Sequence, residues 1–214
     1  MIVLAFRSII PSIPLEWWEI GQILRKNIFF TLPVLGISLI FHNSIHDMSI
    51  IRRHLHKDAL LGLIVAACML IPSLLYSGSF KFLAAGQLSP GQLAVVLFSG
   101  FIYNIFMAAL PEELFFRAFL QRRLGAGLRS PLSGVLLSAL FFGLVHSAGN
   151  TAWGYGRGFF GGLAEAVFVQ AFIGLIYGVI YLRTRNVFLC IILHAFSNTV
   201  TNLAFFATKL GYTP

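Results

Sequence analysis

Charged residues are scarce in this sequence. Asp, Glu, Lys and Arg together make up 10% of its 214 residues, whereas 58% of the residues are hydrophobic. A soluble domain carries about a quarter charged residues, because its surface has to be solvated. The composition therefore excludes a soluble globular domain, and we predict an integral membrane protein whose solvent is the lipid bilayer.

Cysteine and acidic residues are also few. The two cysteines, Cys68 and Cys190, both lie inside apolar runs. This position excludes a disulfide framework, and we expect both to be small core hydrophobes. Seven acidic residues stand against 15 Lys and Arg, which gives a net charge of +8.

The basic residues form short clusters between the apolar runs, at 25–26, 52–53, 122–123 and 183/185. Loops of membrane proteins place basic residues in this way, where they contact anionic lipid head groups. No basic patch is interleaved with aromatic residues, so we expect the lipid bilayer and no nucleic acid as a partner. The distribution of Lys and Arg over the two sides is too even to fix the orientation.

The apolar runs predict an all-α fold, a polytopic transmembrane helix bundle. A span needs about 20 residues, and paired tryptophans beside charges suit a helix at the head-group level. We therefore predict an interfacial helix over residues 14–26 and about six spans, over 28–41, 59–76, 91–120, 131–148, 159–182 and 186–208. No repeat of fixed period occurs, so residues 1–214 are expected to form one domain, with its motif-bearing core over 91–208.

Three of the seven acidic residues fall within predicted spans: Glu112, Glu113 and Glu165. An ionisable group at membrane depth costs roughly 3 kcal/mol or more, so each needs a partner or a purpose. Glu113 and Arg117 stand four residues apart with the acid first, the favourable order for a helical ion pair. We predict this pair, which leaves Glu112 available for chemistry.

Three more polar residues lie at similar depth. His146 ends the fourth predicted span, and His194 and Asn198 share one face of the sixth. If the helix ends near 122, 131 and 186 lie on one side of the membrane, Glu112 and these three residues fall within about two helical turns of each other. We therefore predict a polar site near the midplane, built from three helices.

These residues form three motifs, in order, each on its own predicted helix. They read Glu-Glu-x-x-x-Arg over 112–117, Phe-x-x-x-His over 142–146 and His-x-x-x-Asn over 194–198. The set resembles the CAAX protease and bacteriocin-processing family, also called Abi, which includes the type II CAAX prenyl endopeptidases.

The resemblance implies a glutamate-dependent intramembrane endopeptidase. In that scheme Glu112, helped by His146, polarises a water for attack on a peptide carbonyl. His194 and Asn198 stabilise the oxyanion, while Glu113 and Arg117 hold the first glutamate in place. The resemblance further implies that the protein needs no cofactor and cleaves a membrane-associated protein or peptide. We expect it in the prokaryotic cytoplasmic membrane, whereas the substrate's identity and the oligomeric state are not encoded in the motifs.

Other functions remain open at this point. The same glutamates and histidines could bind zinc in an intramembrane metalloprotease, although no His-Glu-x-x-His is present and Arg117 would repel a metal ion. The polar residues could also hold a ligand in a non-catalytic immunity or binding protein, and a transporter is a weaker alternative because no paired halves are seen.

A few polar and small residues have no assigned role. The histidines of the loop 42–56 could bind a metal, but a hydrated loop at the membrane interface is the simpler interpretation. Glu165 and Gln170 could line the cavity or bond a neighbouring helix. Gly174 and Gly178 permit close helix packing, within the chain or in a dimer.

Overall fold

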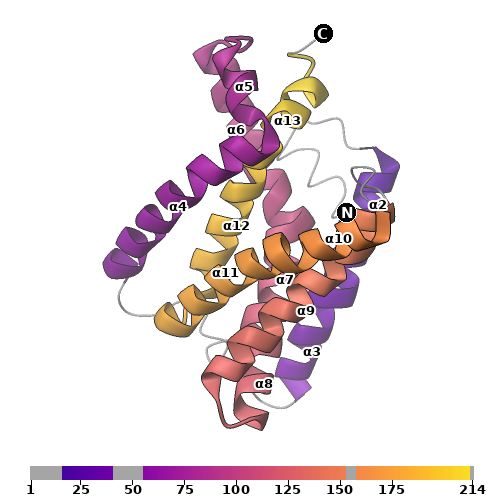
Figure 1. Ribbon diagram of the computed structural model, residues 1–214, viewed down its shortest axis with the longest axis vertical. Helices are drawn as coiled ribbons and strands as arrows, with labels where there is room; N and C mark the ends of the chain where they lie inside the picture. The colour runs from indigo at the N-terminus through magenta and orange to yellow at the C-terminus, as the bar shows by residue number, and fades with distance from the viewer. Residues whose placement is uncertain (1–15, 41–54, 153–157, 213–214) are drawn as a thin grey trace. The chain divides into compact units, whose positions relative to one another are not determined.

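The computed structural model describes residues 16–40, 55–152 and 158–212, and every regular element in these ranges is helical (Figure 1). No strand occurs in the described ranges, so the predicted all-α class is confirmed. The histidine-rich loop 42–56 lies outside the residues whose side chains the structure describes.

The chain forms two compact units. The first comprises Met1–Leu32, His54–Pro111 and Ile191–Pro214, and the second comprises Pro33–Arg53 and Glu112–Cys190. Both units are assembled from separate stretches of sequence. The prediction of one domain over 1–214 stays a prediction.

The N-terminal helices run together without a break: α2 (Trp17–Lys26), η1 (Asn27–Thr31) and α3 (Leu32–Ile40). Helix α2 begins with a reciprocal capping box between Glu16 and Glu19. At its end the Asn27 side-chain amide donates to the Ile23 carbonyl and to the Phe106 carbonyl, at 2.8 and 3.0 Å. The predicted interfacial helix and first span are therefore one continuous helical stretch.

The core of the first unit lies between α2, α6 (Pro90–Asn104) and α13 (Leu203–Lys209), whose buried apolar side chains pack together. Helix α6 starts at a proline behind a Ser89–Gln92 capping box, which fixes its first turn. Helices α4 (Leu55–Ser77) and α5 (Ser79–Ala84) also belong to this unit. Cys68 on α4 is exposed, so the expectation of a core position was wrong for it, whereas Cys190 is buried as expected.

One long helix carries the first motif. It runs from Pro90 to Gly127 as α6, η2 (Ile105–Ala109), α7 (Leu110–Glu113), η3 (Leu114–Gln121) and α8 (Arg122–Gly127). Proline inside a helix lacks an N–H and crowds the carbonyl four residues earlier. The π turn η2 ends two residues before Pro111, and at its end the Leu110 N–H donates to the Ile105 carbonyl, five residues back. This wider turn keeps the chain helical through the proline.

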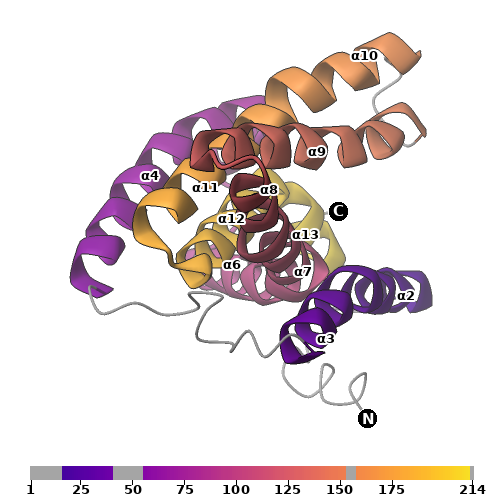
Figure 2. The same cartoon turned by 90° about the horizontal axis from the view of Figure 1, so that it is seen from below.

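Helix α9 (Pro131–Ala152) is the centre of the second unit. It packs against α8, η3, α10 (Gly158–Glu165), η4 (Ala166–Gln170) and α11 (Ala171–Thr184) (Figure 2). A Cβ on Gly174 would lie 3.3 Å from the Ala139 backbone, and one on Gly178 would lie 3.0 Å from Val135. The two glycines therefore serve packing within the chain, one of the two alternatives that the sequence left open.

Two described helices are long and apolar enough to cross a membrane, Pro90–Gly127 and Gly158–Thr184. A third candidate is the pair α12 (Val187–Thr201) and α13, bent by 72° at Asn202. The apolar parts of α4 and α9, Leu60–Leu75 and Pro131–Ser147, are shorter. The described residues thus contain two or three clear spans, and the predicted count of six is not confirmed.

Candidate active site

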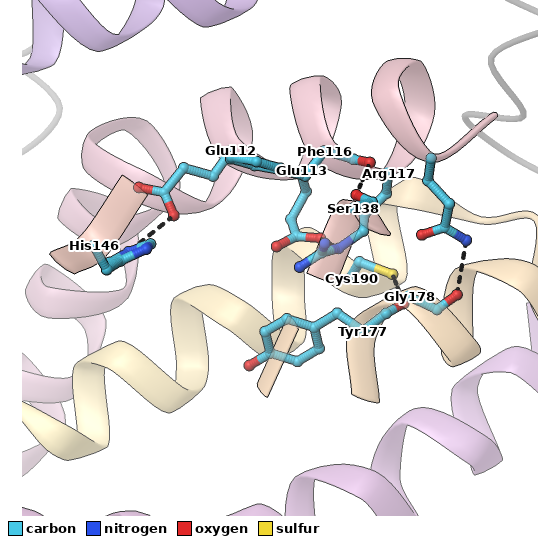
Figure 3. Close-up of polar contacts among 10 residues, drawn as sticks. Glu112, Glu113, Phe116, Arg117, Ser138, His146, Tyr177, Gly178 and Cys190 are labelled. Carbon is cyan, nitrogen blue, oxygen red and sulfur yellow. Dashed lines mark hydrogen bonds and ion pairs between the residues drawn. The ribbon is translucent and has the colours of Figure 1, made fainter. Parts of the chain in front are cut away.

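The second unit brings the first two motifs together (Figure 3). The long helix supplies Glu112, Glu113 and Arg117, and α9 supplies His146. The two adjacent glutamates point in different directions, Glu112 toward His146 and Glu113 toward Arg117. All four side chains belong to the same compact unit.

The predicted ion pair between Glu113 and Arg117 is present. Arg117 Nε donates to Glu113 Oε2 at 2.9 Å, and both side chains are completely buried. The four-residue separation within the helix sets this distance. A buried pair of this kind neutralises both charges, and removing either partner would leave the other uncompensated.

Aromatic rings surround the remainder of the Arg117 guanidinium. Its central carbon lies 4.8 Å from the ring centroid of Phe142 and 6.0 Å from those of Phe116 and Tyr177. Its Nη1 and Nη2 atoms make no hydrogen bond within the described part of the chain. Cation–π contacts, which can exceed about 2 kcal/mol when desolvated, therefore take the place of hydrogen bonds on this side of the guanidinium.

Glu112 and His146 form a looser pair. Glu112 Oε2 lies 3.9 Å from His146 Nε2, beyond hydrogen-bond distance, and the two side chains are 6% and 28% exposed. At this separation both atoms can bond one water molecule placed to the side of the line that joins them. The pair is thus close enough to act on a common water and is reachable from the surface of the unit.

The backbone fixes which histidine nitrogen faces Glu112. His146 Nδ1 lies 2.6 Å from the Phe142 carbonyl oxygen, one turn back on α9. A carbonyl only accepts hydrogen bonds, so Nδ1 carries a proton and donates it. Nε2, the nitrogen that faces Glu112, then carries no proton in the neutral ring.

Three side chains that contact backbone carbonyls of neighbouring helices near the site were not predicted from the sequence. Ser138 Oγ donates to the Phe116 carbonyl at 2.7 Å, which ties α9 to the π-helical segment η3. Gln121 Nε2 donates to the Gly178 carbonyl at 2.9 Å, and Cys190 Sγ contacts the Tyr177 carbonyl at 3.6 Å. The signal available for Ser138 was its spacing: it stands four and eight residues before Phe142 and His146, on the same face of a helix.

The third motif lies in the first unit. His194 and Asn198 are one turn apart on α12, with His194 buried and Asn198 half-buried. The Asn104 side-chain amide donates to Thr199 Oγ1 at 3.2 Å and so ties this part of α12 to α6. The predicted convergence of His194 and Asn198 with Glu112 stays a prediction, because these residues belong to different units.

Among the residues that the structure describes, no three His, Cys, Asp or Glu side chains lie close enough together to bind a metal ion. The zinc alternative needs a histidine of the third motif beside Glu112 and His146, so it too depends on how the units meet. Glu165 is buried at the end of α10 and Gln170 is half-buried at the end of η4. The structure assigns no role to either residue.

The chain matches the sequence model of a known protein family. A sequence model described as type II CAAX prenyl endopeptidase Rce1-like matches residues 94–200, half of the chain, and this range contains all three motifs. No curated protein and no solved structure matches the chain.

Proposed function

Because the chain belongs to the type II CAAX prenyl endopeptidase Rce1-like family of intramembrane proteases, we propose that Glu112 activates the water that cleaves its substrate. The observation that carries this proposal is the Glu112–His146 pair at 3.9 Å, with His146 oriented by the Phe142 carbonyl. A carboxylate and an imidazole that share one water are a general acid–base pair.

The proposed reaction is hydrolysis of a peptide bond. Glu112 takes a proton from the water while the water oxygen forms a bond to the peptide carbonyl carbon. The carbon–nitrogen bond then breaks, and the proton passes to the leaving nitrogen through Glu112 or His146. One product gains the hydroxyl group as a carboxyl, and the other gains the proton as an amine.

His194 and Asn198 are proposed to donate hydrogen bonds to the oxyanion of the tetrahedral intermediate. Removing one such donor costs about 3–4 kcal/mol in other hydrolases, so each is expected to matter for turnover. Glu113 and Arg117 are positioning residues in this scheme, since their closed pair holds the helix turn that presents Glu112. No resident cofactor is required.

The substrate is proposed to be a membrane-associated protein or peptide. The family's description is that of a CAAX prenyl endopeptidase, so we propose that a lipid-modified tail, which would reach a site on apolar helices from the membrane side, is one candidate substrate. We further propose a bundle of about six spans in the prokaryotic cytoplasmic membrane, with the shorter helices α4 and α9 among the spans.

The test compares two buried glutamates. Glu112→Gln should lower turnover of a farnesylated, internally quenched CAAX peptide by at least about a hundredfold with little change in melting temperature. Glu165→Gln is the matched control, because it makes the same change on another apolar helix. We expect it to keep most of the activity. An equal loss in both variants would contradict the assignment, and the same peptide without the prenyl group tests whether the lipid is recognised.

Two further arms separate water activation by Glu112 from activation by zinc. Under the glutamate scheme, active protein should hold far less than one equivalent of metal and should survive chelation. Asn198→Ala should lower turnover by about a hundredfold, because asparagine is a good oxyanion donor and a poor zinc ligand. Stoichiometric zinc that is lost together with activity would replace the proposal by the metalloprotease alternative.

A further inference from the structure

Two arginine clusters that are sixty residues apart in the sequence line one cavity of the second unit. The cavity measures about 420 Å³ and lies where α8 and α11 end and α9 begins. Its lining includes Arg122 and Arg123 from one cluster and Arg185 from the other. The described lining contains no carboxylate.

The local electrostatic balance is strongly positive. The chain has no acidic residue between Glu113 and Glu165, or after Glu165. The ends of α8 and α11 contribute about half a negative charge each, and the start of α9 at Pro131 contributes about half a positive charge. Three guanidinium groups outweigh these dipoles, so the cavity attracts anions.

Local structure holds the arginines in position. The Arg123 guanidinium lies 5.9 Å from the ring centroid of Phe119. Arg185 has a left-handed backbone, with φ of 53°, and its N–H donates to the Tyr181 carbonyl at 2.8 Å. Arg122 and Arg185 are half-buried. Basic residues in a last helical turn are favourable by themselves, but that effect does not require three of them around one cavity.

The position of the cavity at the ends of the membrane-crossing helices indicates which kind of anion would bind in it. Both helices that are clearly long enough to cross a membrane, Pro90–Gly127 and Gly158–Thr184, end at it. Guanidinium groups bind phosphate through paired hydrogen bonds, and the ends of spans lie at the head-group level. We propose that this cavity binds the phosphate of an anionic phospholipid head group. The proposal does not depend on the catalytic one.

The test counts bound lipid. Wild-type protein in nanodiscs of phosphatidylcholine with a minor fraction of phosphatidylglycerol should retain one phosphatidylglycerol in native mass spectrometry. Arg123→Gln with Arg185→Gln should weaken that retention by roughly thirtyfold, since each arginine near an anionic surface contributes about fivefold. Arg183→Gln is the matched control, because Arg183 is exposed at the end of the same helix and does not line the cavity. It should change retention by less than threefold.

Several results would overturn the assignment. Equal weakening by Arg183→Gln would mean that general surface charge attracts the lipid. A second arm adds inorganic phosphate to protein in phosphatidylcholine nanodiscs with and without phosphatidylglycerol. Arginine-dependent stabilisation by phosphate that is equal in both would identify a soluble phosphate ligand instead. Loss of peptide cleavage by the double variant in those nanodiscs would assign the cavity to the substrate. A double variant that melts like wild type in detergent but loses lipid retention supports the proposal without any appeal to folding.

Discussion

Two neighbouring carboxylates of the same helix have opposite surroundings. Glu113 is completely buried, bonded to Arg117 at 2.9 Å, and the arginine is surrounded by three aromatic rings. Glu112 stands 3.9 Å from a histidine that is 28% exposed. The first pair is in direct hydrogen-bond contact and fully buried, whereas the atoms of the second pair lie beyond hydrogen-bond distance and its histidine is partly exposed. The difference teaches that adjacent residues on one turn of helix can have different partners, one in a closed ion pair and the other facing a histidine of a neighbouring helix.

Phe142 separates the two arrangements and takes part in both. Its ring lies against the Arg117 guanidinium, and its centroid lies 4.7 Å from that of the His146 ring. Its carbonyl accepts a hydrogen bond from His146 Nδ1. The side chain therefore serves the closed pair, and the backbone serves the open one. Variants that change only the side chain can tell the two contributions apart.

The largest effect on stability is expected for Arg117→Ala. It leaves Glu113 buried and unpaired, which typically costs about 3–5 kcal/mol in free energy of unfolding. The melting temperature in detergent should fall clearly, and adding Glu113→Gln should restore most of the loss. Arg183→Ala, at an exposed arginine, is the control and should change little. A double variant that melts no higher than Arg117→Ala would show that the pair is not the source of the stability.

Phe142→Leu should have an intermediate effect. It removes the ring beside Arg117, a contact worth about 1–2 kcal/mol in a desolvated site, but keeps the carbonyl that orients His146. We expect a lower melting temperature and a smaller effect on turnover. Phe141→Leu, at the exposed neighbouring phenylalanine, should be close to neutral. If Phe142→Leu abolished turnover without lowering stability, the ring would belong to the catalytic pair instead.

Ser138→Ala should have the smallest effect. It removes one buried hydrogen bond, to the Phe116 carbonyl, and should cost about 1 kcal/mol. Ser147→Ala on the same helix is the control, because the Ser147 hydroxyl bonds only within its own turn and is near the surface. Equal melting temperatures for the two variants would mean that the Ser138 contact does not hold η3 on α9.

Most of the helical fold could be predicted from the sequence, but not the continuity of the helices. The predicted apolar runs lie within a few residues of most observed helix ends, but the long helix continues past the predicted end at 120 to Gly127, and α5 was not predicted. A proline inside a helix often breaks or kinks it, yet the helix that contains the π turn η2 continues through Pro111. The 72° bend at Asn202 was not anticipated at all. Both features depend on backbone hydrogen bonds between turns, which hydropathy does not report.

The candidate site was predictable to a similar extent. The Glu113–Arg117 pair follows from a four-residue spacing, and the structure contains it. The pairing of Glu112 with His146 joins two helices, and the resemblance suggested it before the structure placed both side chains. The rings around Arg117 could not be foreseen, because Tyr177 comes from a third helix.

The sequence by itself determined four properties of the protein: that its surroundings are the lipid bilayer, that its fold is all-α, which family it belongs to, and that Arg117 is the partner of Glu113. Each of these depends on composition or on spacing within one helix, where geometry is fixed by the backbone. Only the tertiary structure decided that His146 lies 3.9 Å from Glu112. It also decided which aromatic rings pack against the Arg117 guanidinium and which arginines share a cavity. These depend on side chains from different helices meeting at distances of a few ångströms, and packing alone sets such distances.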